Sequence, residues 1–246
     1  MSTERPTPIS SASSHSRAAS RARSDSSFII HRSSLPARLR ASVPPWFFVL
    51  LLLLAAAPST QPTLSYTFEN LTALPDDILV LSGEFSIQKE NNNSFLQLAP
   101  SPIDSHAILL GHESSTPTSI SARIFASNTG KRSPEFGVGL AGAAGYKLRL
   151  MPALNQLQLL KNEDTLASIP YTWPPSTWTT FHLQLTKLPT GKLQLQATAH
   201  PSDKPAPAQW MLSYTDPDQD PPTGRASLFA TPYSETPTRF DDILIQ

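Results

Sequence analysis

The sequence predicts an all-β fold over residues 62–246, an antiparallel β-sandwich. Three observations predict it. Apolar and polar residues alternate in many short segments, turn residues separate these segments roughly every 8 to 15 positions, and no window repeats apolar residues with the period of a helix. Proline supplies 25 of the 246 residues. Because proline interrupts helices and central strands, we expect it between many short strands.

Residues 1–42 are rich in serine and arginine and contain one short apolar cluster, Phe28–Ile30. Such a segment buries too little apolar surface to offset the entropy of ordering it, so we expect it to be disordered. A basic arm that binds nucleic acid or anionic lipid is the alternative. The whole chain has 19 basic and 19 acidic residues, which gives a nucleic-acid partner no support.

Residues 43–60 contain an uninterrupted apolar run from Trp46 to Ala57. As a helix this run would be about 18 Å long, shorter than the roughly 30 Å hydrocarbon core of a bilayer. Basic residues precede it and small residues follow it, which is typical of a signal peptide. A retained membrane anchor is the alternative. Both predict that the β-domain is exported, to the periplasm, the cell exterior or the outer side of a membrane.

From residue 62 onwards the apolar period is two. The clearest cases are 120–126, 181–185 and 193–199, which predict half-buried strands. Between the last two, Pro189 and Gly191 predict a tight hairpin turn. Further strands are expected at 65–69, 83–88, 95–99, 106–111, 136–141, 146–151, 156–160, 209–214, 225–230 and 240–246.

The stretch GVGLAGAAG, residues 137–145, contains the spacing G-x-G-x-x-G of a dinucleotide-binding loop. That loop requires a strand before it and a helix after it, because the pyrophosphate rests on the helix N-terminus. Here Tyr146, Leu148 and Leu150 alternate with basic residues, so a second strand follows. We therefore expect a hairpin connection and no nucleotide cofactor.

The motifs of common catalytic sites are missing from the sequence. With no cysteine there is no disulfide framework, thiolate metal site or cysteine nucleophile. The motifs G-x-S-x-G, H-E-x-x-H and E-x-D-x-x-E do not occur. Residues 216–220 place three carboxylates at alternate positions, as a calcium loop does, but Pro221 and Ser227 stand where that loop needs Gly and Glu. No catalytic residue is predicted, and the enzyme question stays open, leaning towards a protein without catalysis.

Ligand contacts are predicted in and near the segment YTWPPSTW, residues 171–178. Tyr171 and Trp173 lie in a proline-rich loop, where an exposed ring can stack on the face of a sugar. Tyr146 and Arg149 are weaker candidates. Trp178 begins a strand and is expected in the core.

A structural calcium ion is possible at Glu69 and Asp241. Strand alternation puts Asp241 on the same face as Ile243 and Ile245, where a buried carboxylate needs a cation or several hydrogen-bond donors. Glu69 would be a co-ligand if the first and last strands pair. Capping of backbone N–H groups by Asp241 is the alternative, and no other cofactor is expected.

From Tyr66 to Gln246 the order of features resembles the concanavalin A-like, laminin-G-like domains of exported bacterial proteins. The resemblance is carried by SYTFEN at 65–70, GEFSI at 83–87, YKLRL at 146–150, IPYTWPPSTWTTFHLQL at 169–185, PAPAQW at 205–210, TDP at 215–217 and FDDILI at 240–245. It implies a jelly-roll sandwich. It also implies a role in carbohydrate binding, or as an accessory module of an envelope protein.

Together these observations predict an exported, non-catalytic lectin-like binding or accessory module, with a glycan or a cell-envelope component as its partner. Some relatives in the resembling group are sugar hydrolases of the 3-keto-disaccharide type, so a carbohydrate-active hydrolase is one alternative. A purely structural envelope domain is the other. No catalytic position of those hydrolases matches a residue of this chain.

Overall fold

The structure is a computed structural model and describes residues 63–112, 117–129, 132–218, 223–233 and 236–246. The predicted N-terminal segments 1–42 and 43–60 lie outside these ranges. The described residues form strands, turns and one short 3-10 helix, η1 (Pro152–Leu154), with no α-helix. No helix in these ranges has the length and apolarity needed to cross a membrane.

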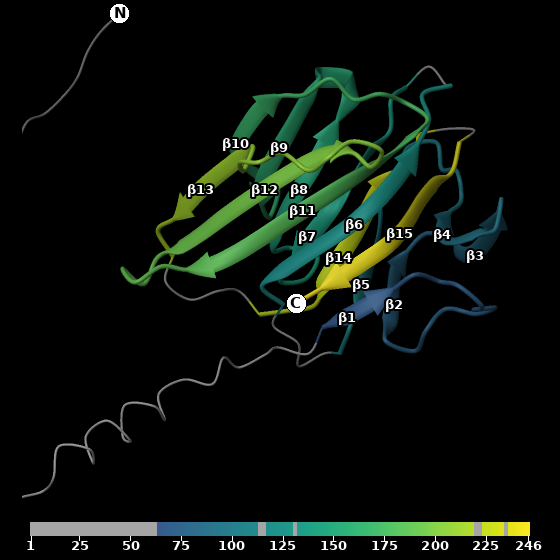
Figure 1. Cartoon of the computed structure of the whole chain (residues 1–246), viewed down its shortest axis with the longest axis horizontal. Helices are drawn as coiled ribbons and strands as arrows, with labels where there is room; N and C mark the ends of the chain where they lie inside the picture. The colour runs from purple at the N-terminus through teal and green to yellow at the C-terminus, as the bar shows by residue number, and fades with distance from the viewer. Residues whose placement is uncertain (1–62, 113–116, 130–131, 219–222, 234–235) are drawn as a thin grey trace, which may run out of the picture. The chain divides into compact units, whose positions relative to one another are not determined.

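The strands form two antiparallel sheets that pack face to face, as Figure 1 shows. Sheet A has the order β13-β12-β11-β6-β15-β4-β3, and β1 also pairs with β15. Its strands are β1 (Leu64–Tyr66), β3 (Phe85–Glu90), β4 (Asn93–Leu98), β6 (Ser119–Ala126), β11 (Thr177–Lys187), β12 (Leu193–Pro201), β13 (Leu212–Asp216) and β15 (Thr238–Ile245).

Sheet B has the order β10-β9-β8-β7-β14-β5-β2. Its strands are β2 (Ile78–Ser82), β5 (His106–Leu110), β7 (Glu135–Leu140), β8 (Tyr146–Met151), β9 (Gln156–Lys161), β10 (Asp164–Pro170) and β14 (Ala226–Thr231). Strand β14 lies between β5 and β7 and pairs with both, although it is far from them in the sequence. The predicted all-β, two-sheet antiparallel sandwich is therefore confirmed.

Two hairpins confirm predictions from turn residues. The stretch 137–145 consists of the second half of β7 and the turn that joins it to β8, in which Gly142 has a φ of 81°. Strand β8 follows it directly, so the helix that a dinucleotide-binding loop requires does not begin here. The second hairpin joins β11 to β12, and its Gly191 has a φ of 85°. Both glycines occupy the left-handed region that other residues adopt at a cost.

The core lies between the sheets and takes every second residue of the strands. At its centre the ring of Phe136 in β7 faces that of Phe181 in β11, with centroids 5.7 Å apart and an edge-to-face orientation. The indole of Trp173 packs against the other side of Phe136 at 5.4 Å. All three residues are buried, so this aromatic group joins the two sheets.

Two tyrosines carry polar links from one sheet to the other. Tyr146 of sheet B donates its hydroxyl proton to Asp216 of sheet A at 2.8 Å, and Lys161, beside Tyr146 on β9, contacts the same carboxylate oxygen at 2.9 Å. Tyr66 of β1 donates to Asp77, just before β2, at 2.6 Å. Burial raises the pKa of both tyrosines most, and the neighbouring carboxylate raises it further. Both hydroxyls therefore stay protonated and donate hydrogen bonds.

A β-bulge changes the predicted orientation of Asp241. The register of β15 against β6 shifts between Asp241 and Leu244, and Asp242 has a φ of 46°. Because of this extra residue, Asp241 lies opposite Arg123 on the outer face of sheet A, whereas Ile245 pairs with the inward residue Ile120. The expectation that Asp241 shares a face with Ile243 and Ile245 is therefore wrong.

Candidate functional site

The candidate site begins with two glycines on the outer face of sheet B. Along β7 the residues Phe136, Val138 and Leu140 point into the core, so Gly137 and Gly139 face outward without side chains, and the side chains of Phe229 and Ser227 cover them. A Cβ atom on Gly137 would lie 1.9 Å from the carbonyl oxygen of Leu148 and 2.8 Å from the ring of Phe229. The close approach of neighbouring strands therefore requires glycine here.

A pocket of about 140 Å³ opens on the outer face of sheet B beside Phe229 and Ser227. It is small beside the roughly 300–1,000 Å³ of pockets for drug-sized ligands, so it fits one unit of a longer ligand. Strands β5, β7, β8 and β14 supply most of its walls. The lining residues are Ser105, His106, Ala107, Glu135, Ala143, Lys147, Arg149, Glu163, Ser227, Phe229 and Thr231.

Phe229 is the aromatic residue of the pocket. It is half-buried, and its strand partners are Gly137 on one side and Ala107 on the other. Because neither partner has a large side chain, the ring is the main apolar surface on this part of the sheet. The amine of Lys147 lies 5.6 Å from the ring centroid. An aromatic ring bordered by a cation and hydroxyl groups can take a ligand with both an apolar face and polar edges.

Four charged side chains line the pocket, and three of them, Lys147, Arg149 and Glu163, form ion pairs with one another. The Nζ atom of Lys147 lies 2.6 Å from Glu163, and an Nη atom of Arg149 lies 3.7 Å from the same carboxylate. Arg149 also donates to the side chain of Gln158 at 3.0 Å. The Nε of Arg149 and the Nδ1 of His106 are buried and have no hydrogen-bond partner among the described residues. The charged groups of Lys147 and Glu163 remain partly exposed at the pocket.

The structure separates the four residues predicted to contact a ligand. Arg149 lines the pocket. Tyr146 lies on the opposite face of the same strand and is buried, with its hydroxyl bound to Asp216. Trp173 is buried in the core, and Tyr171 is half-buried against it. Burial raises the pKa of the Tyr171 hydroxyl. Tyr146 and Trp173 therefore offer no surface to a ligand in this structure.

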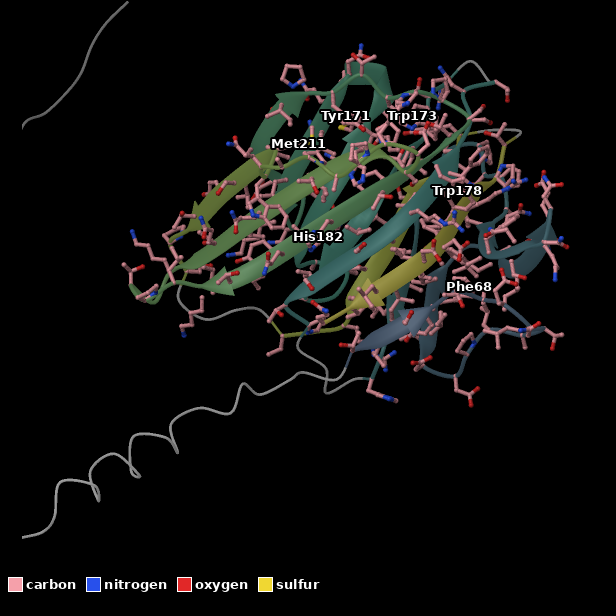
Figure 2. All side chains as sticks on the ribbon, viewed as in Figure 1. Phe68, Tyr171, Trp173, Trp178, His182 and Met211 are labelled. Atoms are coloured by element: carbon pink, nitrogen blue, oxygen red, sulfur yellow. The ribbon has the colours of Figure 1, made fainter. Side chains whose placement is uncertain are left out.

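Trp178 differs from its expected core position. Its side chain is half-buried on the outer face of sheet A, where it contacts the rings of Phe95 and Phe125 and where the guanidinium of Arg123 lies 4.7 Å from its centroid. Figure 2 shows Trp178 well apart from Tyr171 and Trp173. The segment 171–178 therefore supplies no continuous aromatic surface.

The carboxylates predicted as calcium ligands are engaged by other groups. Glu69 accepts hydrogen bonds from the backbone N–H and the hydroxyl of Ser94, and these bonds lower its pKa. Asp241 is buried, contacts Arg123 at 2.6 Å and accepts a hydrogen bond from Asn93 at 3.0 Å. Strands β1 and β15 do pair, as that hypothesis required.

Among the described residues no group of three or more histidine, aspartate and glutamate side chains could hold a metal ion. A guanidinium supplies the positive charge beside Asp241. A chelator experiment decides between a calcium ion and these protein groups as the partners of Glu69 and Asp241.

Sequence reasoning missed most of the pocket. The alternation around Lys147 and Arg149 and the paired glycines of 137–139 were visible in the sequence. Phe229 could not be assigned to the same site, because its strand is distant from β7 in the sequence and only the folded sheet brings the two together.

Comparison with known proteins gives similarity at the level of fold. No family model matches the chain, and no curated protein sequence matches it. Among solved structures, the apo Crh5 transglycosylase superposes with a TM-score of 0.52 at 13% identity, covering 76% of this chain and 84% of that one. The GH43 protein BlXynB from Bacillus licheniformis gives 0.51 at 13% identity, covering 74% and 39%.

The carbohydrate-binding module CBM66 from Bacillus subtilis gives a TM-score of 0.49 at 9% identity, covering 72% of this chain and 98% of that one. The two structures with TM-scores above 0.5 show a shared β-sandwich fold.

Proposed function

We propose that the β-sandwich is a non-catalytic, concanavalin A-like module that binds a glycan of the cell envelope or its surroundings through the pocket on sheet B. One observation carries the proposal: the half-buried ring of Phe229 lines a pocket and is bordered there by hydroxyl and charged side chains. A sugar has apolar C–H faces and hydroxyl edges, so it pairs with such a surface.

The shared fold supports the proposal in a limited way. The Crh5 transglycosylase has also been solved in complex with NAG, at a TM-score of 0.52 and 12% identity. The fold is therefore compatible with a sugar ligand, while the choice of pocket rests on the residues of this chain.

Calorimetric titration with a panel of cell-wall and algal oligosaccharides tests the proposal. We expect binding that Phe229→Ala weakens by about tenfold or more, a loss of at least about 1.4 kcal/mol. Leu154→Ala is the matched control, because Leu154 is an apolar side chain that is 55% exposed and lies outside the pocket. If no oligosaccharide binds, or if both variants bind like the wild type, the proposal fails.

A carbohydrate-active hydrolase is the second candidate, because two carboxylates line the same pocket. Glycosidases commonly place a pair of carboxyl groups across the scissile bond. Glu163 is occupied by Lys147 and Arg149, whereas the carboxylate of Glu135 has no hydrogen bond or ion pair to another described residue. This free carboxylate is the specific feature that favours hydrolysis.

Product analysis after prolonged incubation with the same oligosaccharides separates the two functions. A binding module releases no shortened product. If products appear and Glu135→Gln abolishes them while binding persists, the protein is a hydrolase.

We also propose that residues 43–60 export the domain, supported by the apolar run after a basic segment. Mass spectrometry of the mature N-terminus tests this. Cleavage after Ala57 or Ser59 is expected for a signal peptide, and an intact N-terminus in the membrane fraction indicates an anchor.

A further inference from the structure

We propose that the sugar recognised by this pocket is a uronic acid, whose carboxylate replaces that of Glu163 between Lys147 and Arg149. The inference rests on the proposed glycan-binding function and adds the chemical class of the ligand. Two cations of the pocket, Lys147 and Arg149, pair with the same exposed carboxylate, that of Glu163.

The two cations are fixed on one face by strand alternation. Lys147 and Arg149 are two residues apart on β8, so both point to the outer face of sheet B. Their side chains are only 16% and 22% exposed. The Nε of Arg149 lacks a hydrogen-bond partner among the described residues. The other acid of the pocket, Glu135, forms no ion pair with either cation. Two partly buried positive charges therefore share one carboxylate.

That carboxylate can leave at little cost. Glu163 lies in the two-residue turn between β9 and β10, after Asn162 with its left-handed φ of 54°, and its side chain is 73% exposed. An ion pair with so exposed a partner contributes little to stability, because solvent screens it. A ligand carboxylate held in place by its own sugar ring can make the two parallel hydrogen bonds that a guanidinium favours. The exchange therefore favours an acidic ligand.

The ring of Phe229 lies close to one of these two cations. The amine of Lys147 lies 5.6 Å from the centroid of this ring. A sugar packed on Phe229 therefore has its edge within reach of Lys147, and a carboxylate is the substituent that a cation selects. The hydroxyls of Ser105 and Thr231, which are bonded to each other at 2.6 Å, lie in the same pocket and can bind neutral hydroxyls of the ligand.

The test uses oligosaccharides of pectate, alginate and glucuronoxylan, each in its native form and after chemical reduction of its carboxyl groups. Calorimetry on the wild-type protein is expected to give at least tenfold tighter binding of one native oligosaccharide than of its reduced form. Raising the salt concentration should narrow this difference. Arg149→Gln should lose the preference for the native form, with folding checked by thermal melting.

Glu163→Gln should strengthen binding of the native oligosaccharide, whereas Arg149→Gln should remove the preference for it. Removing the competing carboxylate should tighten binding of the native form by up to about fivefold, since its ion pair contributes about 1 kcal/mol at most. Asp203→Asn is the matched control, because Asp203 is also 73% exposed and forms a surface ion pair away from the pocket. It removes the same overall charge and should leave affinity unchanged.

Equal affinity for native and reduced forms would overturn the inference, as would weaker binding by Glu163→Gln. Binding confined to neutral oligosaccharides would overturn the inference and leave the proposed glycan-binding function in place. No binding by any oligosaccharide would overturn both.

Discussion

Replacing Tyr146 by phenylalanine should destabilise the sandwich and leave ligand binding unchanged. The change removes only the hydroxyl that bonds to Asp216 at 2.8 Å. A hydrogen bond to a charged group contributes about 1.5–3 kcal/mol. Asp216 retains Lys161 at 2.9 Å and the backbone N–H of Asp218 at 3.0 Å. Because the carboxylate is not stranded, we expect the lower value, about 1.5 kcal/mol.

Asp216→Asn should cost more than Tyr146→Phe. Breaking a buried ion pair costs about 3–5 kcal/mol, but Lys161 is 25% exposed and also pairs with Asp218. We therefore expect about 2–3 kcal/mol after allowing for the solvent around Lys161.

The effect of Asp216→Asn should depend on pH. Burial alone would raise the pKa of Asp216, but hydrogen bonds from Lys161, Asp218 and Tyr146 outweigh it and hold the pKa below its ordinary value. A carboxyl group with a lowered folded-state pKa stabilises the protein fully above its unfolded pKa of roughly 3.9, and this stabilisation is lost as the pH falls through the folded-state value. Hydrogen bonds that Lys161 donates to Asp216 and Asp218 raise the pKa of Lys161, so its contribution is lost only above roughly pH 10.4.

Urea unfolding of the wild type and both variants at pH 7 and pH 3 measures these differences. The cost of Asp216→Asn should be large at pH 7 and smaller at pH 3. If Tyr146→Phe left the free energy of unfolding unchanged and weakened oligosaccharide binding, Tyr146 would be a ligand contact and the inter-sheet role would be refuted.

Three further predictions concern single positions. Gly137→Ala should destabilise the protein by about 1–3 kcal/mol in urea unfolding and weaken oligosaccharide binding, because the new Cβ meets backbone and the ring of Phe229; unchanged stability would contradict this packing. Trp173→Ala should reduce the free energy of unfolding by about 3–5 kcal/mol and lower the melting temperature, since the indole is buried. Weaker oligosaccharide binding at unchanged stability would instead show that Trp173 contacts the ligand. A chelator should leave the melting temperature unchanged, because Glu69 and Asp241 already have protein partners; a clear decrease would establish the calcium ion.

The sequence predicted those parts of the fold that depend on neighbours in the chain. Alternation identifies a strand because successive side chains point to opposite faces. The hairpins at 137–145 and around Gly191 follow from turn residues within a few positions. The same alternation places Tyr146 and Arg149 on opposite faces of β8, so the two residues cannot contribute to one site.

The remaining features depend on pairing between distant segments. The bulge at Asp242 reverses the face of Asp241, and nothing in a two-residue period indicates an extra residue. Trp178 differs from these cases, because it lies three residues before the inward Phe181 and alternation alone places it on the outer face of sheet A. Phe229 joins the pocket because β14 pairs with β7.

The central claim is that a glycan binds to the outer face of sheet B. Titration of the isotopically labelled protein with the tightest-binding oligosaccharide, followed by amide NMR spectra, tests it most directly. The largest shifts should fall on Gly137, Gly139, Lys147 and Phe229. Shifts confined to sheet A, around Arg123 and Trp178, would contradict the account.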